Sequence, residues 1–506
     1  MDPQIVAGVD LGSNSFHMIV ARVDDGQLRI VDRMRERVRL ATGLDAEHRL
    51  SEEATERALA CLTRFGQRVR ELPLGTVRAA GTNTLRQAKN SAAFLERAQA
   101  ALGHPIDIIA GREEARLIYL GVSHGVPNDD GRRLVVDIGG GSTECILGEG
   151  FEPVATESLF MGCVSYSTRF FPGGALDRDS FRRAQTAAML ELQSIATEYR
   201  RLGWSSCYGS SGTVLALAEL VQASGWSEQG ITRKALKKLR AALCAAENTR
   251  ALSLPGLDPE RALVLPGGLA ILLAVTKSLG IELMLPAQSA LREGLLYDLL
   301  GRIRHEDVRE RSIRWLADRA RADAEQAARV ERTAQSCLEQ VARAWNLTSE
   351  DDRHHLSWAA RLHEIGLEIS HTGFHKHGAY IVGHADMPGF SRNEQQLLAF
   401  IVHAQRRKFP LEALAALPLA ERERALRLGI VFRLACALNR SRSSEPLPPF
   451  ELHAEGKTLS LRLAGDGFDR APLTRADLAE EAERLAAAGV VLHISGASEA
   501  PMSPRE

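Results

Sequence analysis

The chain has 506 residues, of which 45% are hydrophobic and 25% are charged, and its formal net charge at pH 7 is −1. These are ordinary values for a globular protein, so they exclude a disordered or fibrous chain. The length favours two to four domains, at roughly 100 to 200 residues each. A net charge so close to zero gives no long-range attraction for a polyanion, which would need a local basic groove.

Seven cysteines are scattered along the chain without any C-x-x-C spacing. We expect reduced, mostly buried thiols, which are typical of a cytoplasmic protein. The N-terminus has no basic segment followed by an apolar core, and no apolar run approaches the ~20 residues that span a bilayer. We therefore expect a soluble cytoplasmic protein, and peripheral association with a membrane stays open.

Residues 5–23 predict a strand, a loop and a second strand. The apolar first strand ends at Asp10, and an alternating second strand begins at Phe16. The loop between them contains Gly12, Ser13, Asn14 and Ser15. One acidic residue before a glycine turn is weak evidence, because many ordinary hairpins contain it.

Helices and strands alternate in the next segment. A helix, a strand, a turn leading into a second helix, and a second strand are expected at residues 51–72, 77–80, 81–86 and 106–110. The helix that begins at Gly111 carries Glu113 and Glu114 in its first turn. The helix dipole and capping favour acidic residues there, so these residues alone favour a structural role for both, although one could face the loops.

Residues 134–147 repeat the organisation of residues 5–23. A β-branched strand ends at Asp137, and a second strand begins at Glu144. Backbone N–H groups in a glycine loop can turn toward an anion, and the two carboxylates could hold the cation that accompanies a phosphate. Two such units indicate two related lobes. The loop in this second unit consists of Gly139, Gly140, Gly141, Ser142 and Thr143.

A third loop of this kind lies between a short strand and an apolar helix at 214–223. The N–H groups at the start of that helix would make another anion site. The loop contains Ser210, Ser211, Gly212 and Thr213. A strand at 153–159, helices at 179–203 and 263–279, and a turn and helix from Ala290 complete an α/β region that ends near residue 300.

Strand patterns disappear after residue 302, and amphipathic helices are expected from Val308 to about Asn439. This region contains His363, His371, His375, His377, His384 and His403. A metal centre needs carboxylates beside its histidines, but no carboxylate neighbours His371, His375 or His377 in the sequence. His363 is followed by Glu364, whose side chain is longer than that of the aspartate expected in a metal-binding pair. We therefore favour a structural or anion-facing histidine cluster over a catalytic metal.

The C-terminal segment begins with a Ser- and Pro-rich linker at 441–449. Two alternating strands, a helix and a last strand are expected at 450–454, 458–463, 473–488 and 490–494. These elements predict a small α+β module. The tail from Ser498 to Glu506 is expected to be frayed.

Six of these motifs together resemble the exopolyphosphatase and guanosine pentaphosphate phosphohydrolase family, and are most similar to its long, four-domain bacterial exopolyphosphatases. They are residues 9–17, Gly81-Thr-Asn-Thr-Leu-Arg86, 111–117, 136–144, 209–213 and Leu291-Arg-Glu-Gly294. The resemblance implies an α/β actin-like ATPase fold of two ribonuclease-H-like lobes with the site between them, then an all-α HD-like domain and the α+β module. The implied domains are 1–124, 125–304, 305–440 and 441–506.

The resemblance also implies a role for individual residues. Glu114 matches the catalytic base, which overrides the structural interpretation of that position, and Arg86 matches a phosphate-contacting arginine. Asp137 and Glu144 match carboxylates of a magnesium site; an additional activating monovalent cation such as K⁺ stays open. The three loops, with Asp10 before the first, match phosphate-binding segments. The family also implies a homodimer, and no nucleic-acid partner is expected.

These expectations lead to a hypothesis of processive hydrolysis of the terminal phosphate of linear polyphosphate. Glu114 would deprotonate the attacking water, Mg²⁺ would neutralise non-bridging oxygens, and loop N–H groups with Arg86 would hold the phosphates. Hydrolysis of guanosine pentaphosphate (pppGpp), or both activities, is the alternative; the third glycine, Gly141, favours polyphosphate. A sugar or acetate kinase and a non-catalytic sensor or filament-forming ATPase relative are more distant alternatives.

A long polyanion also needs a basic path away from the cleft. The candidates all lie in the helical region, where an ordinary solvated cationic face is an equally good interpretation of each residue. They are His375, Lys376, His377, Arg406, Arg407 and Lys408.

Overall fold

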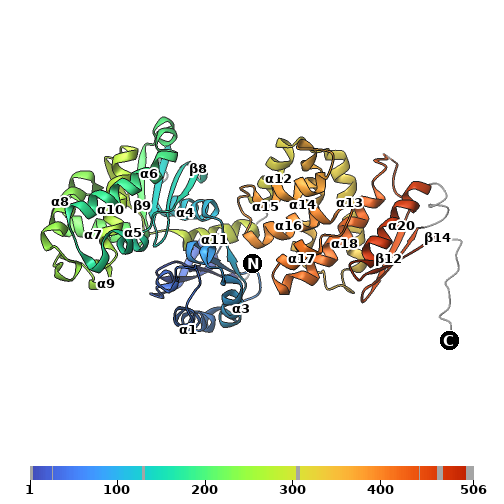
Figure 1. Ribbon diagram of the computed structural model, residues 1–506, viewed down its shortest axis with the longest axis horizontal. Coiled ribbons are helices and arrows are strands. Elements are labelled where there is room, and N and C mark those ends of the chain that lie inside the picture. Colours follow the sequence, from blue (N-terminus) through green and yellow to red (C-terminus); the bar gives the residue numbers. More distant parts are fainter. Residues whose placement is uncertain are drawn as a thin grey trace. The chain divides into compact units, whose positions relative to one another are not determined.

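The computed structural model describes residues 4–24, 27–127, 131–303, 308–443, 445–463 and 471–496. The chain divides into two compact units, residues 1–307 and 308–506 (Figure 1). The expected frayed tail, 498–506, lies outside the described residues. No helix in the described part of the chain is long and apolar enough to cross a membrane.

The first lobe of unit 1 is built on a five-stranded sheet with the order β3-β2-β1-β4-β5. The three N-terminal strands pair antiparallel, and β4 and β5 add in parallel. The strands are β1 (Gln4–Leu11), β2 (Phe16–Asp24), β3 (Gln27–Glu36), β4 (Val77–Gly81) and β5 (Ile106–Ile108). The helical segments are η1 (Leu40–Gly43), α1 (Glu52–Val69), α2 (Asn83–Gln87), α3 (Ser91–Leu102) and α4 (Gly111–Gly125).

The second lobe contains a six-stranded sheet with the order β10-β11-β9-β6-β7-β8. Its strands are β6 (Arg132–Ile138), β7 (Thr143–Glu149), β8 (Glu152–Leu159), β9 (Ser206–Ser210), β10 (Ile231–Thr232) and β11 (Leu283–Pro286). Its helical segments are α5 (Cys163–Phe170), η2 (Pro172–Gly174), α6 (Arg178–Leu202), α7 (Ser211–Ala223), α8 (Arg233–Ala246), η3 (Thr249–Ala251), α9 (Pro259–Ala262) and α10 (Leu265–Leu279).

The two sheets share one topology, as the repeated sequence pattern predicts. In each, an antiparallel meander of three strands is followed by a strand that adds in parallel to the first, β4 beside β1 and β9 beside β6. The paired turns fall at the same place, with Leu11 opposite Phe16 and Ile138 opposite Thr143. Both glycine-rich loops are therefore hairpin turns at the ends of equivalent strands. The two lobes form the expected actin-like fold.

Helix α11 (Leu291–Ile303) ends unit 1 and packs on the first lobe. Its Leu296 and Leu299 share a buried cluster with Val6 and Ile19 of the first sheet. It also lies along α4, which begins directly after β5. The chain thus returns to the first lobe after completing the second.

Unit 2 consists of helices followed by a three-stranded sheet. The helical segments are α12 (Val308–Arg319), α13 (Ala324–Val341), α14 (Glu350–Leu362), η4 (Ile365–Glu368), α15 (Phe374–His384), α16 (Arg392–Ala404), α17 (Leu411–Ala416), η5 (Leu419–Glu421) and α18 (Arg422–Leu438). The C-terminal elements are β12 (Phe450–Glu455), β13 (Thr458–Leu463), α20 (Pro472–Ala486) and β14 (Val491–Gly496). The helices and the sheet share one continuous hydrophobic core.

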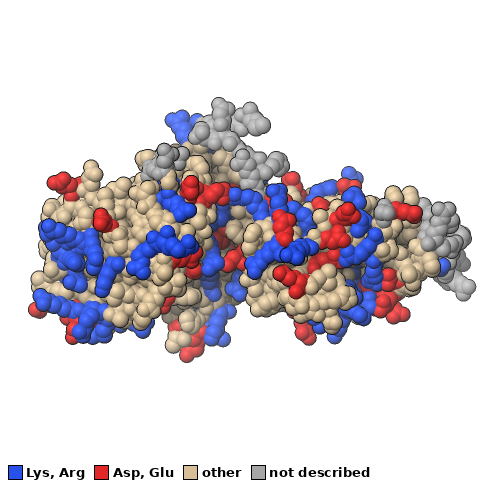
Figure 2. All heavy atoms as spheres, turned by 90° about the horizontal axis from the view of Figure 1, so that it is seen from above, with Lys and Arg blue, Asp and Glu red and all other residues tan. Residues whose placement is uncertain are grey.

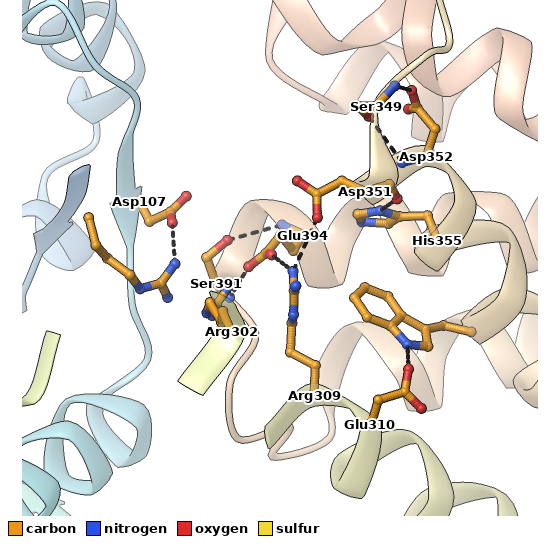
Figure 3. A network of polar contacts seen from close by, with 12 residues as sticks. Asp107, Arg302, Arg309, Glu310, Ser349, Asp351, Asp352, His355, Ser391 and Glu394 are labelled. Carbon is orange, nitrogen blue, oxygen red and sulfur yellow. Dashed lines mark hydrogen bonds and ion pairs between the residues drawn. The ribbon is translucent and has the colours of Figure 1, made fainter. Parts of the chain in front are cut away.

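Polar contacts fasten the first helix of unit 2 to its neighbours (Figure 3). Arg309 of α12 lies 2.6 Å from Glu394 of α16 and 3.6 Å from Asp351 of α14. Glu310 accepts a hydrogen bond of 2.5 Å from the indole of Trp358. Because the Arg309 and Trp358 side chains are buried, these contacts fix α12 more firmly than surface ion pairs would.

Several elements differ from the sequence expectation. The strand expected at 106–110 ends at Ile108, because Ala110 already caps α4. The apolar stretch 263–279 begins its helix at Leu265, after the separate short helix α9. Strand β3 and helices α5 and α8 were not predicted, since charged and mixed residues obscure their periodicity.

Acid should destabilise unit 2 through His375. Burial and the neighbouring His403 lower the pKa of His375 to about 4, whereas an unfolded histidine titrates near 6.5. Between these values the unfolded chain binds the proton and the folded chain does not, so the free energy of unfolding falls as the pH drops from 6.5 to 4. In urea titrations, the fall in the free energy of unfolding between pH 6.5 and 4 should be smaller in His375→Gln than in the wild type, by on the order of 1 kcal/mol. An equal fall in both proteins would contradict the assignment of this pH dependence to His375.

Candidate active site

A cavity of about 870 Å³ separates the two lobes of unit 1. All three predicted loops line it, together with Glu114 from α4. The predicted residues on its wall are Asp10, Gly12, Ser13, Asn14, Ser15, Glu114, Asp137, Gly139, Gly140, Ser142, Ser211, Gly212 and Thr213. The other predicted residues of this site do not line the cavity: Arg86 and Ser210 contact Glu114 and Asp137, Thr143 and Glu144 are buried, and Gly141 is half-buried.

The first two loops meet across the cavity. A Cβ atom placed on Gly140 would lie 3.0 Å from Cβ of Ser13, and one placed on Gly141 would lie 2.1 Å from Nδ2 of Asn83. The Thr84 hydroxyl donates to Oγ of Ser13 at 2.8 Å, which ties the first loop to α2. Glycine at 140 and 141 leaves room for this approach, because a Cβ atom would be tight against Ser13 at the first position and would displace the Asn83 amide at the second. Sequence reasoning did not identify this role.

Helix α5 braces the second loop from behind. The N–H groups of Cys163 and Val164 donate to the carbonyls of Gly139 and Gly140, each at 2.9 Å. The loop carbonyls thus face the protein, so they do not compete for the cavity. Gly162 makes this contact possible, because a Cβ atom there would lie 2.3 Å from the carbonyl oxygen of Gly140.

The substitution Gly162→Ala should therefore displace the second loop. The added methyl meets backbone atoms, which have no room to rotate away, and a displacement near 1 Å in an active site costs up to about 10²-fold in turnover. We expect that loss in steady-state kinetics with the protein still folded. Gly383→Ala, in helix α15 of unit 2, controls for a general effect of substituting glycine, because a Cβ atom there would meet no atom closer than 3.7 Å. Equal activity of the two variants would contradict this account.

Four carboxylates gather around the cavity. Burial raises the pKa of Asp10 to about 8, and the charge of Glu114 adds to the effect. Burial also raises the pKa of Asp137 to about 6, although the Ser210 hydroxyl, 2.5 Å from its Oδ2, opposes the shift. The pKa of Glu144 is raised well above its usual range by burial and by Glu114. Such crowding of acids favours a bound cation.

The acidic residues fit Mg²⁺. Within the described residues, no group of three or more His, Cys, Asp or Glu side chains converges closely enough to hold a metal without other ligands. Mg²⁺ usually binds one or two carboxylates and completes its octahedron with water and substrate phosphates. Asp10 suits this role, because its buried Oδ1 has no hydrogen-bond partner, and Asp137 and Glu144 supply further hard oxygen donors.

The adjacent acids of α4 have separate partners. The Glu113 carboxylate accepts two hydrogen bonds of 2.8 Å from Arg116, which turns it away from the cavity. Glu114 lines the cavity and accepts a hydrogen bond of 2.7 Å from Nη1 of Arg86, which also donates to the carbonyl of Ile109 at 2.9 Å. The structural interpretation of first-turn acids thus applies to Glu113, and Glu114 is available for chemistry.

The third loop completes the wall with an unusual backbone. Ser211 has a φ of 82°, in the left-handed region that disfavours a side chain with a Cβ. Strained residues of this kind persist where the surrounding structure imposes them, often at ligand sites. The Gly212 carbonyl accepts a hydrogen bond of 2.9 Å from Arg261, so the end of the loop is held from the side of α9.

Arginines form the mouth of the cavity and were missed by sequence reasoning. Arg33 and Arg35 belong to β3, Arg37 and Arg39 follow it, and Arg261 and Arg292 come from the second lobe and α11. Burial, followed by the charge of Arg261, lowers the pKa of Arg35. Arg37 pairs with Asp258 and Glu260. The alternation of arginine in residues 33–39 was the available signal, but without β3 it indicated only a charged surface.

The histidine-rich part of unit 2 is organised differently. Glu364 pairs with Arg442, and the Nδ1 atom of His363 contacts the carbonyl oxygen of Ala360 at 2.6 Å. The ring of His375 lies 5.8 Å from that of His403, and the guanidinium of Arg406 lies over the ring of Phe374 at 5.0 Å. The structure therefore brings His375 and Arg406 into one basic cluster with Lys376, which lowers the pKa of His375.

Positive and negative side chains are otherwise interspersed over the face in Figure 2, in keeping with the net charge of −1. The seven cysteines are all free, as expected.

Two ribonuclease-H-like lobes that enclose three glycine- and hydroxyl-rich loops, with buried acids at their centre, define an actin-like protein that handles phosphoryl groups. The chain belongs to the Ppx/GppA phosphatase family. Residues 19–303 match the family model, and residues 308–482 match the model of its domain III.

Two curated relatives that match nearly the whole chain share the same name. The chain is 42% identical over 480 residues to the guanosine-5'-triphosphate,3'-diphosphate pyrophosphatase of Aeromonas hydrophila, with 95% of this chain and 96% of the relative covered. It is 43% identical over 482 residues to the protein of that name from Vibrio cholerae, with the same coverage.

The similar solved structures are shorter. An exopolyphosphatase from Cytophaga hutchinsonii aligns with a TM-score of 0.54 and 25% identity over 59% of this chain and 98% of its own. The PPX-GPPA enzyme of Aquifex aeolicus aligns with a TM-score of 0.50 and 27% identity over 58% of this chain and 99% of its own. The full-length comparisons thus favour the guanosine pentaphosphate alternative over the polyphosphate reaction that the sequence analysis preferred. The third glycine was too small a feature to decide between them.

Proposed function

We propose that this protein hydrolyses the terminal phosphoanhydride bond of the 5'-triphosphate group of guanosine 5'-triphosphate 3'-diphosphate (pppGpp). The observation that carries the proposal is a set of apolar side chains in the lining of the cavity that the phosphate loops also line. We call this set the apolar wall; it consists of Val164, Phe171, Leu215, Leu263 and Val264. A linear polyphosphate has no apolar part to place there, whereas a nucleoside does. Full-length relatives named for this substrate support the same choice.

The reaction follows from the residues around the cavity. A water oxygen attacks the terminal phosphorus, the bond between that phosphorus and the bridging oxygen breaks, and orthophosphate and guanosine tetraphosphate leave. Glu114 accepts the proton of the water, while the loop N–H groups hold the phosphate oxygens. When bound by Asp10, Asp137 or Glu144, Mg²⁺ supplies positive charge for the non-bridging oxygens. Arg86 does not line the cavity, but its hydrogen bond to Glu114 can orient the base.

The apolar wall gives a substrate-specific test. Leu263 lines the cavity and is 53% exposed, so Leu263→Ser should not disturb the core. Losing part of an apolar contact worth about 1.5–3 kcal/mol should raise KM for pppGpp severalfold and leave KM for polyphosphate unchanged. The control is Leu190→Ser, an exposed leucine of α6 away from the cavity. Equal effects on both substrates would argue against a nucleoside at this wall.

Polyphosphate hydrolysis is the second candidate. It is favoured by the similar exopolyphosphatase structure and by the basic cluster of unit 2, where His375, Lys376, His377, Arg406, Arg407 and Lys408 remain the proposed path for a long chain. Lys376→Glu/Arg406→Glu should weaken binding of long chains more than short ones and reduce its dependence on salt. If binding is weakened equally for all chain lengths, these residues do not form a path for long polyphosphate.

A further inference from the structure

A buried network of ion pairs joins α4 to α11 and to the first sheet. Arg116 of α4 holds the Glu113 carboxylate through two hydrogen bonds of 2.8 Å and also donates to Oδ1 of Asp298 on α11. The second carboxylate oxygen of Asp298 lies 3.0 Å from Arg302 and 3.4 Å from Arg78 of β4. Arg116, Glu113 and Asp298 are no more than 7% exposed as side chains.

The two helices touch through their backbones beside this network. A Cβ atom on Gly294 of α11 would lie 1.8 Å from the carbonyl oxygen of Leu117, and one on Gly121 of α4 would lie 2.2 Å from that of Ala290. Glycine at both contacts lets the two backbones approach this closely, and apolar side chains of both helices, among them Leu117 and Leu295, pack in one buried cluster. The hydrogen bonds of Arg116 are directional, so they add a restraint on the sliding and rotation of one helix along the other.

Both helices present groups to the cavity from their N-terminal ends. Glu114 follows directly after Glu113 in α4, so the carboxylate that Arg116 holds is next to the one that lines the cavity. Arg292, in the first turn of α11, also lines the cavity, and its charge partly offsets the rise in the pKa of Asp10 that burial causes. A shift of α4 against α11 would therefore change the position of Glu114 relative to the acids and Arg292.

Stability alone does not explain such a network. Burying two acids and three arginines costs desolvation energy that their attraction only partly returns, and apolar residues of the same volume often stabilise as well or better. A fixed geometry is what ion pairs provide and apolar packing does not.

We propose that Arg116 is a positioning residue for the hydrolysis reaction: clamped between Glu113 and Asp298, it sets the register of α4 against α11 and thereby the place of Glu114 in the cavity. This inference rests on the proposed function, since it takes Glu114 as the base. Arg116 itself does not line the cavity and touches no substrate.

The test compares kinetics with folding for Arg116→Met, Arg116→Lys and Asp298→Asn in the full-length protein. We expect kcat to fall by about 10-fold to 10²-fold with KM within about twofold, because binding groups stay in place while the base moves. Arg116→Lys keeps the positive charge but loses the planar guanidinium that bonds two partners at once, so its kcat should lie between those of Arg116→Met and the wild type. Circular dichroism and thermal melting establish that each variant is folded at the assay temperature.

Arg133→Met is the matched control. Arg133 is another buried arginine of unit 1, and it donates to the Ser123 hydroxyl at the far end of α4 at 3.0 Å. This variant should lose thermal stability yet keep its kcat.

Each outcome decides the inference. A wild-type kcat in folded Arg116→Lys and folded Asp298→Asn would overturn it. So would losses of rate that the unfolded fraction of each variant fully accounts for. If Arg116→Met does not fold, the other two variants, which preserve size and one partner, decide the question. A wild-type protein that releases no phosphate from pppGpp or polyphosphate would instead refute the proposed function, so the two failures are distinguishable.

Discussion

Replacing Glu114 by glutamine should lower kcat by about 10³-fold, within the 10²- to 10⁴-fold range of general-base catalysis. Glutamine has the same shape and its oxygen can still accept the hydrogen bond from Arg86, so the substrate site should persist and KM should change little. Only the capacity to take a proton from water is lost. The measurement is steady-state phosphate release, combined with titration of bound substrate.

Glu157→Gln serves as the control for this prediction. Glu157 lies on β8, pairs with Arg112 of α4 at 3.1 Å and does not line the cavity, so its neutralisation should leave kcat unchanged. A Glu114→Gln protein with wild-type turnover would remove Glu114 from the chemistry and leave only a structural role in pairing with Arg86.

Asp137→Asn should be nearly as damaging, with kcat lower by about 10³-fold at ordinary Mg²⁺ concentrations. A metal in a phosphoryl-transfer site contributes several kcal/mol, and about 1.4 kcal/mol corresponds to each factor of ten. The Ser210 hydroxyl can still bond the amide oxygen, so the fold should survive. The Mg²⁺ concentration for half-maximal activity should rise in the same variant.

The stability of Asp137→Asn provides an independent readout. Because burial raises the pKa of Asp137 to about 6, its charge is unfavourable above that pH when no cation is bound. At pH 8 without Mg²⁺ the variant should melt no lower than the wild type, whereas Asp177→Ala, which removes the side-chain N-cap of α6, should melt lower and keep its activity. Unchanged Mg²⁺ dependence in Asp137→Asn would exclude this residue from the cation site.

The loops and the two-lobed fold could be predicted from short stretches of sequence. The three loops were found because glycine and hydroxyl residues follow an apolar strand each time, and a hairpin between neighbouring strands is a short-range structure. The repetition of Asp10 and Asp137 predicted the two lobes for the same reason. The resemblance supplied the proposed catalytic role of Glu114, which its first-turn position alone did not indicate.

The parts that were missed depend on contacts far apart in the sequence. Nothing near Arg116 indicates a partner at Asp298, and the arginines of residues 33–39 face the cavity only because β3 pairs with β2. Gly162 reads as an ordinary glycine until α5 is packed against the second loop. The proposed preference for pppGpp depends on such contacts too, since the apolar wall is assembled from α5, α7 and the segment before α10.

The most direct test of the proposed function measures phosphate release from pppGpp, long-chain polyphosphate and ATP in parallel, with the wild-type protein and Mg²⁺. We predict that kcat/KM for pppGpp exceeds that for polyphosphate by at least about tenfold, a difference of ~1.4 kcal/mol in transition-state binding, with guanosine tetraphosphate as the second product. ATP, which lacks the guanine and the 3'-diphosphate, should be a poor substrate. A higher kcat/KM for polyphosphate, or release from ATP equal to that from pppGpp, would contradict the proposal.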